Sequence, residues 1–213
     1  MPLTADSLEL GPVGTNCYVV RADASAREAV VVDPGAEAGR VLELLDRLGA
    51  RCAAILVTHT HYDHIGGVAD LAEATGAPVY APAGEAMVLE DPNSFYAQLG
   101  LSIRPWTAER YLEGGEELEL AGVKFAVVSV PGHSPAHLAF HADGALLSGD
   151  VLFAGSVGRT DLPGCSWDLL VESIRLLTES YPPETVVHPG HGPQTTLGAE
   201  LARNPFLAEL RAP

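Results

Sequence analysis

Short runs of apolar residues, each bounded by Gly, Asp or Pro, open the chain and predict β-strands. They lie at residues 8–10, 16–20 and 29–32, and we expect them to pair antiparallel. The next segment, residues 36–48, places its large apolar side chains at helical spacing and ends at Gly49. This pattern predicts an amphipathic helix with one buried face.

From residue 52 onward, the pattern alternates between strands and helices. In the first half it predicts strands at 52–57 and 78–80 and helices at 68–74 and 85–89. The second half repeats the scheme, with strands at 117–120, 123–130, 138–141, 145–148 and 185–188 and a helix at 167–180. Because strands dominate and helices punctuate both halves, we expect an α/β (α+β) protein with two sheets packed face to face and helices outside.

The length of 213 residues fits one domain, residues 1–213, and 47% hydrophobic residues are ample for a sizeable core. No low-complexity linker divides the chain. Residues 91–108 form the loosest stretch, which is either an ordinary connector or a surface excursion over a functional site.

Charge and cysteine content narrow the partners and the compartment. Acidic residues exceed basic ones by 28 to 12, which argues against nucleic acid, whose phosphates are bound by Lys and Arg. Lys124 is the single lysine, so recognition of a carboxylate would need an arginine. The first residues resemble no secretory signal, and no run approaches the roughly 18 apolar residues of a membrane span. Three well-separated cysteines fit reduced thiols in a cytoplasm; they are Cys17, Cys52 and Cys165.

Three imidazoles and a carboxylate follow directly after the apolar run 53–57. They are His59, His61, Asp63 and His64. In an extended loop, a His-x-His pair points both rings to the same side, and Asp63 with His64 then faces a second position. Imidazole nitrogen and carboxylate oxygen are ligands that zinc-like divalent ions prefer. The stretch therefore predicts a metal site rather than a chance cluster of surface residues.

Further candidate ligands stand at the ends of later predicted strands: His133, Asp150 and His191. We expect one ion to be held by His59, His61 and His133, and another by Asp63, His64 and His191, with Asp150 bridging them. This count matches a two-metal hydrolytic centre. The alternative, a structural zinc, would normally be a closed site that includes cysteines, and no cysteine pair has suitable spacing.

The chain resembles the metallo-β-lactamase superfamily and, within it, the hydroxyacylglutathione hydrolase (glyoxalase II) branch. The similarity covers nearly the whole length. It rests on the motifs at residues 15–18, 33–35, 59–64, 131–135, 149–150, 158–163 and 189–192. The resemblance implies an αββα sandwich of two mixed sheets flanked by helices, with the metal ions in a cleft at the sheet edges.

Two departures from glyoxalase II bear on the substrate. That enzyme carries a carboxy-terminal helical domain with part of its glutathione site, whereas this chain ends 22 residues after His191, with room for one or two short helices. Its glutathione-contacting lysine corresponds to Arg159 here. Arg159 is either a bidentate anchor for a carboxylate or a partner of Asp161 within its own loop. Asp150 argues against antibiotic hydrolysis, because β-lactamases of the superfamily typically differ at that position.

Asp33 and His137 are candidates for orienting the ligands. Metal-bound imidazoles usually donate their other nitrogen to a carboxylate, which favours Asp33, although Asp-Pro-Gly is also an ordinary turn. His137 is either such a partner or a histidine satisfied locally. We expect His141 and His188 to be structural.

The leading hypothesis is hydrolysis of a thioester, such as S-lactoylglutathione or another 2-hydroxyacyl thioester, by a metal-bound hydroxide that Asp63 orients or deprotonates. A thiolate leaves without needing a proton. The expected cofactors are two divalent ions, zinc foremost, with iron and manganese as alternatives. One rival hypothesis is persulfide dioxygenase, with a single iron on His59, His133 and Asp150. The other is a non-catalytic metal-binding domain.

Overall fold

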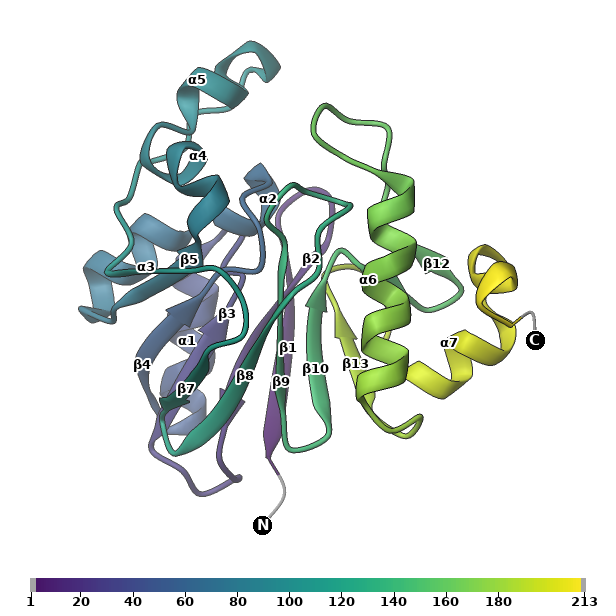
Figure 1. Cartoon of the computed structure of the whole chain (residues 1–213). Helices are drawn as coiled ribbons and strands as arrows, with labels where there is room; N and C mark the ends of the chain where they lie inside the picture. Colours follow the sequence, from purple (N-terminus) through teal and green to yellow (C-terminus); the bar gives the residue numbers. More distant parts are fainter. Residues whose placement is uncertain (1–2, 212–213) are drawn as a thin grey trace.

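The computed structural model describes residues 3–211 and arranges most of the strands in two mixed sheets of six strands each. Helices cover the outer face of each sheet, so the molecule has four layers (Figure 1). The predicted αββα sandwich is confirmed.

The first sheet has the order β1-β2-β3-β4-β5-β6. Its strands are β1 (Thr4–Leu10), β2 (Thr15–Arg21), β3 (Glu28–Val32), β4 (Arg51–Leu56), β5 (Val79–Pro82) and β6 (Arg110–Leu112). The first three pair antiparallel, as their pattern predicts. From β3 to β6 the pairing is parallel, because a helix or a long connection returns the chain between successive strands.

The second sheet has the order β14-β13-β10-β9-β8-β7. Its strands are β7 (Glu117–Leu120), β8 (Val123–Ser129), β9 (Leu138–Ala142), β10 (Ala145–Gly149), β13 (Val186–Pro189) and β14 (Thr195–Thr196). Only β10 and β13 pair parallel, across helix α6 (Trp167–Ser180). A separate two-stranded ribbon joins β11 (Leu152–Phe153) to β12 (Ser156–Val157).

The larger helices agree with the sequence pattern. α1 (Ala38–Leu48) ends at Gly49, whose φ of 62° suits a residue without a side chain, and α6 covers the predicted range 167–180. The others are α2 (Tyr62–Ile65), α3 (Val68–Thr75), α4 (Ala86–Glu90), α5 (Asn93–Tyr96) and α7 (Leu197–Arg203), with 3-10 turns η1 (Ala83–Glu85), η2 (Ala97–Leu99) and η3 (Pro205–Arg211). Within the described residues, no helix is long and apolar enough to cross a membrane.

Three apolar clusters separate the four layers. In β2, Cys17 and Val19 face the helices α1 and α3, whereas Tyr18 and Val20 face the second sheet. This alternation is the two-residue period of a strand that is buried on both faces. The third cluster packs the second sheet against α6 and α7.

Both sheets place strand ends at one end of the sandwich, and hydrogen bonds join the sheets there. The amide of Asn16 donates to the carbonyl of Gly190 at 2.7 Å, and the amide of Leu138 donates to the carbonyl of Thr58 at 2.8 Å. Each bond fixes a loop that follows a strand of one sheet against the first residues of a strand of the other sheet.

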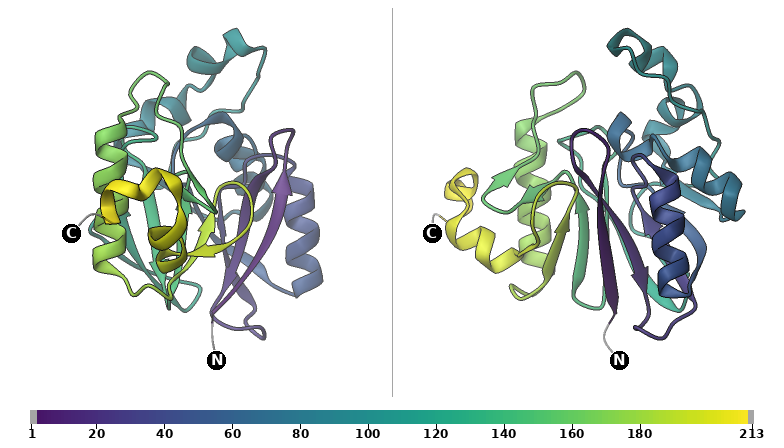
Figure 2. Two further views of the ribbon diagram at one scale, coloured as in Figure 1. Left: turned by 90° about the vertical axis from the view of Figure 1, so that its right-hand side faces the viewer. Right: turned by 180° about the vertical axis from the view of Figure 1, so that it is seen from behind.

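Residues 91–108 prove to be more than a plain connector. They contain α5 and η2, which project at the upper end of the molecule in Figure 1, where the loop between β12 and α6 also rises. The views in Figure 2 show the same segments at that end, together with the tip of the β1–β2 hairpin. The excursion therefore stands beside the loops that carry the predicted ligands.

Candidate metal centre

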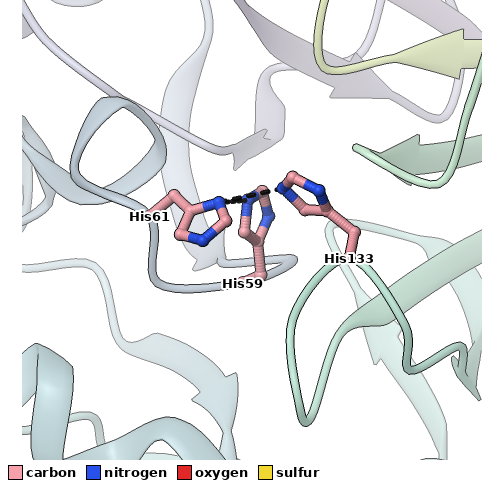
Figure 3. Close-up of side chains that lie close together, drawn as sticks. All are labelled: His59, His61 and His133. Atoms are coloured by element: carbon pink, nitrogen blue, oxygen red, sulfur yellow. Dashed lines mark hydrogen bonds between the residues drawn. The ribbon is translucent and has the colours of Figure 1, made fainter. Parts of the chain in front are cut away.

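The histidines of the first predicted set come from two loops, and their rings converge. Nε2 of His59 lies 3.0 Å from Nδ1 of His61, which lies 2.9 Å from Nε2 of His133. Figure 3 shows the three rings pointing toward one another. Three imidazole nitrogens at such mutual distances are what a single divalent ion could bind.

The second predicted set lies beside the first. Helix α2 is one turn long and presents Asp63 and His64 from adjacent positions. His191 reaches in from the loop after β13, and its Nε2 lies 3.2 Å from Oδ2 of Asp63. Suitable ligand atoms of Asp63, His64 and His191 lie within 4.8 Å of one another.

Asp150 lies between the two sets. Its Oδ2 is 3.4 Å from Nε2 of His133 and 3.5 Å from Nε2 of His191, and its Oδ1 is 3.4 Å from Nε2 of His64. This position is compatible with the bridging role of Asp150, which stays a prediction.

Two buried atoms of this cluster support the fit to a metal ion. Nε2 of His64 and Oδ1 of Asp150 have no well-formed hydrogen-bond partner among residues 3–211. Leaving such atoms unsatisfied is costly, and a cation bound between them would remove that cost.

Asp33 supports one histidine of each set. Its Oδ2 accepts a hydrogen bond from Nδ1 of His64 at 2.9 Å and another from Oγ1 of Thr58 at 2.6 Å. The oxygen of the Thr58 hydroxyl lies 3.0 Å from Nδ1 of His59. Because the hydroxyl hydrogen is used in the bond to Asp33, this oxygen accepts a hydrogen bond from Nδ1 of His59. Both rings are thereby fixed with Nδ1 protonated and Nε2 free to bind a metal.

His133 and His137 are oriented by backbone groups. Nδ1 of His133 donates to the carbonyl of Arg159 at 2.9 Å, which leaves Nε2 facing the cluster. His137 stacks on His59 with ring centroids 4.5 Å apart, and its Nε2 accepts from the amide of Asp150 at 3.1 Å. His137 therefore contacts two predicted ligands.

Burial keeps the first set neutral. It lowers the pKa of His59 well below the ordinary value and that of His61 to about 4. It also lowers the pKa of His133, although Asp150 opposes this shift. Neutral imidazole is the form that binds a metal ion.

The second set is strongly charged. Burial opposes charge on His64, but Asp150 and Asp33 raise its pKa well above the ordinary value. Hydrogen bonds to Asp150 and Asp63 raise the pKa of His191 to about 9. The carboxylates that favour a proton on these rings equally favour a metal cation.

Glycines let the backbone approach the cluster. A Cβ on Gly190 would lie 2.1 Å from Oδ1 of Asp150 and 2.8 Å from Cε1 of His64. A Cβ on Gly158 would lie 1.9 Å from the carbonyl oxygen of Asp150. No side chain fits at either position without displacing Asp150.

Comparison with known proteins agrees with this geometry. Residues 10–191 match the family described as the Metallo-beta-lactamase superfamily. The chain belongs to this superfamily. A relative in Haemophilus influenzae, named hydroxyacylglutathione hydrolase GloC, is 33% identical over 209 residues, covering 94% of this chain and 98% of the relative.

Solved structures of the superfamily share the whole fold. The BLEG-1 B3 metallo-beta-lactamase superposes with a TM-score of 0.90 at 39% identity, covering 96% of this chain and 100% of its own. TTHA1623 in a di-iron-bound form gives 0.84 at 44% identity, with 95% and 100% covered. ETHE1 from Myxococcus xanthus gives 0.81 at 25% identity, with 97% and 85% covered. These names point to different chemistries, so the similarity establishes a metallo-hydrolase superfamily and its fold rather than a substrate.

Arg159 pairs with Asp161 of its own loop, which is one of the two arrangements predicted for it. It also lines the cleft beside the predicted metal ligands. Its Nε and one terminal nitrogen donate to the two carboxylate oxygens of Asp161 at 2.7 and 2.9 Å. Both side chains are exposed, at 60% and 69%. A substrate carboxylate would have to compete with Asp161 for this guanidinium.

The histidines expected to be structural lie away from the cluster. His188 packs edge-on against Tyr18, and its Nδ1 receives a hydrogen bond from Gln194 at 3.0 Å. His141 stacks on Tyr181 with ring centroids 4.0 Å apart.

The sequence pattern did not reveal Glu85, which ties the two histidine loops together. Its Oε2 accepts from the amide and the hydroxyl of Thr60, both at 2.8 Å. Its Oε1 accepts from the hydroxyl of Ser134 at 2.5 Å and the amide of Ala136 at 3.0 Å. No local motif marks this buried acid; only the tertiary fold brings its partners together. Thr15 lies in the motif at residues 15–18 but was assigned no role, although its hydroxyl donates to Asp63 at 2.7 Å.

The cluster of predicted metal ligands opens into a cleft of about 340 Å³. Besides predicted ligands, the lining consists of Val13, Tyr62, Tyr96, Leu99, Arg159 and Leu162. The hydroxyl of Tyr96 donates to the carbonyl of Thr60 at 2.8 Å, which anchors α5 to the histidine loop. Residues from segments far apart in the sequence thus complete the site.

Proposed function

We propose that the protein is a metal-dependent hydrolase that cleaves thioesters, such as S-lactoylglutathione or another 2-hydroxyacyl thioester. The observation that carries the proposal is the pair of His/Asp sets that meet at Asp150 and face one open cleft. The GloC relative supports the thioester class.

Two divalent ions would be held by the residues that converge there. His59, His61 and His133 would bind one, and Asp63, His64 and His191 the other, with Asp150 shared. Bound divalent ions lower the pKa of water and polarise a carbonyl oxygen. Zinc is the first metal to test, and iron is the second because a structural relative is di-iron-bound.

Asp63 would orient the attacking water. Burial opposes its charge, but before a metal ion binds, a hydrogen bond from His191 and the positive His64 lower its pKa to about 2. A bound cation would favour the carboxylate in the same way. Asp63 is therefore a carboxylate throughout the neutral range and accepts a hydrogen bond. The Thr15 hydroxyl, which donates to Oδ2 of Asp63, fixes the direction of that carboxylate.

The cleft favours a leaving group that needs no proton. Among the lining residues in the described chain, every imidazole and carboxylic acid belongs to the predicted ligand sets. Burial raises the pKa of Tyr96, and its hydroxyl already donates to Thr60, so it is a poor acid. A thiolate, with a thiol pKa of about 8.5, leaves unaided.

Two other chemistries are alternatives. One is the iron dioxygenase considered from the sequence, with a single iron on His59, His133 and Asp150. The similarity to a B3 metallo-beta-lactamase adds β-lactam hydrolysis, which the sequence interpretation disfavoured on account of Asp150.

The test combines elemental analysis of freshly purified protein with three assays. S-lactoylglutathione and nitrocefin hydrolysis are measured with and without oxygen, and oxygen uptake is measured with glutathione persulfide. We expect two metal ions per chain and thioester cleavage that does not depend on oxygen. A single iron with persulfide-dependent oxygen uptake, or cleavage of nitrocefin alone, would contradict the proposal.

The His61→Ala variant separates the two metal arrangements. Under the binuclear hypothesis, it loses a ligand and hydrolysis falls by more than about 100-fold. A single-iron triad of His59, His133 and Asp150 does not use His61, so activity would persist. His141→Gln is the matched control, because His141 stacks on Tyr181 outside the cluster.

A further inference from the structure

The cleft beside the predicted metal ligands, called the metal cleft below, has an apolar outer wall. Three separate segments of the chain form this wall. Val13 comes from the turn between β1 and β2, Leu99 from η2, and Leu162 from the loop before α6. These side chains are 47%, 62% and 37% exposed. Figures 1 and 2 show the three segments rising at the same end of the molecule.

Such convergence indicates a binding surface. Single exposed apolar residues are common on soluble proteins, but several that gather around one concave site mark a region that a ligand covers. The apolar surface also continues behind Tyr62 and Asp63, where a second cavity of about 240 Å³ shares these two residues with the metal cleft. Its remaining wall includes Leu10, Pro12, Leu101 and Ile103.

Apart from the metal ions that it would hold, the same cleft has few groups that could bind a charged part of the substrate. Arg159 is the one permanently cationic side chain among its lining residues in the range 3–211. That guanidinium is already bound by both carboxylate oxygens of Asp161. The surface around the metal cluster therefore offers apolar contact more readily than ion pairing.

We propose that the thioester hydrolysed here carries an apolar acyl chain, which lies against Val13, Leu99 and Leu162. This substrate class rests on the proposed thioester hydrolysis. Burying one methylene contributes about 0.8 kcal/mol, which corresponds to about fourfold in kcat/KM. Because the chain contacts the enzyme in the ground state and the transition state alike, the gain falls mainly on KM.

The test uses metal-loaded protein and thioesters of one small uncharged thiol, N-acetylcysteamine, with acetyl, butanoyl, hexanoyl and lactoyl groups. We expect kcat/KM to rise by about fourfold per methylene from acetyl to hexanoyl, and the hexanoyl ester to exceed the lactoyl ester. A flat or falling series among esters that are hydrolysed overturns the acyl-chain proposal alone. Failure to hydrolyse any ester, including S-lactoylglutathione, overturns the proposed function as well.

Substitutions in the apolar wall test whether it causes the rise of kcat/KM with the length of the acyl chain. In Leu99→Ser and Val13→Ser, we expect the ratio of hexanoyl to acetyl kcat/KM to fall by about fivefold or more, because each loses apolar contact with the longer chain. Leu176→Ser is the matched control, since Leu176 is 46% exposed on α6 and does not line the cleft. Wild-type ratios in both wall variants would overturn the assignment.

Discussion

Asp33 illustrates how a single side chain can control a composite site. It contacts His64 directly and His59 through the Thr58 hydroxyl, so one carboxylate orients a ligand in each predicted set. Its backbone adopts a φ of 52°, which is unusual for a residue other than glycine and is tolerated best by Asn and Asp. The sequence identified Asp33 as a candidate partner of a ligand, but not its reach to both sets.

Asp33→Asn should weaken metal binding at both positions. The amide is uncharged and can no longer polarise His64 as a carboxylate does, so we expect metal affinity to fall about 10- to 100-fold. Metal content after dialysis against graded chelator measures the loss. Asp143→Asn is the control, because Asp143 also has a positive φ, of 45°, but lies in the turn between β9 and β10, at the other end of β10 from Asp150. Equal metal retention in both variants would contradict this role.

His188 should make the protein less stable in acid. Its folded pKa is lowered by burial to about 4 from an ordinary value of 6.5, so the unfolded chain binds the proton more tightly. Stability is therefore lost as the pH falls below 6.5, and the full penalty is reached below about 4. At pH 5 the penalty relative to neutral pH is about 2 kcal/mol.

Urea unfolding of wild type and His188→Gln at pH 7 and pH 5 tests this. Glutamine cannot take up the proton but can still accept the hydrogen bond of Gln194. We expect the loss of stability between the two pH values to be smaller in the variant by about 2 kcal/mol. Both proteins are compared at the same metal loading, and identical losses would exclude His188 as the cause.

At the scale of elements, loops that follow ordered strands carry the chemistry. The strands fix where each loop begins, and hydrogen bonds between loops fix where it goes. Glu85 joins the loops of His59 and His133, and Tyr96 joins α5 to the same region. The excursion at residues 91–108 therefore contacts the site, whereas its sequence favoured an ordinary connector.

Tyr96→Phe should loosen this excursion. The variant leaves the buried carbonyl of Thr60 without its donor, at a cost of about 1 kcal/mol. We expect amide hydrogen exchange in residues 93–100 to accelerate about fivefold, together with a higher KM for the thioester. Tyr181→Phe is the control, because Tyr181 stacks on His141 away from the cleft. Unchanged exchange in the Tyr96 variant would show that other contacts hold α5.

At the scale of the whole molecule, the metal cluster lies where the two sheets meet. Ligands come from loops of both sheets: His59 and His61 follow β4, while Asp150 and His191 follow β10 and β13. Bound ions would therefore cross-link the two halves of the sandwich, and their loss would leave several carboxylates close together in a protein of net charge −16.

Chelation should lower the melting temperature reversibly. An ion present at 100 times its dissociation constant contributes about 2.7 kcal/mol, which corresponds to a shift of about 5–10 °C for a chain of this size. Calorimetry before and after EDTA treatment, and after zinc is restored, measures the effect. EDTA already saturated with zinc is the control. An unchanged melting temperature with complete metal removal would contradict a cross-linking role.

Hydrophobic spacing and short motifs predicted most of the periodic elements and the types of residue in the candidate metal site. Strands β1 to β5, α1 and α6 follow from hydrophobic spacing, whereas the three-residue edge strand β6 was not predicted. The group His59, His61, Asp63 and His64 follows from residues that are local in sequence. Local patterns suffice there because strand and helix periods are set by the backbone. Polar residues at the ends of later predicted strands extended the set to His133, Asp150 and His191.

The contacts between residues far apart in the sequence became clear from the fold alone. The sharing of Asp33 between two histidines, the bridging by Glu85, and the apolar wall of Val13, Leu99 and Leu162 all join segments separated by many residues. Arg159 and Asp161 are close in sequence, yet the sequence left two roles for Arg159, and the loop geometry shows that it pairs with Asp161. Such contacts depend on how packed sheets position loop ends in space, and no period along the chain encodes that.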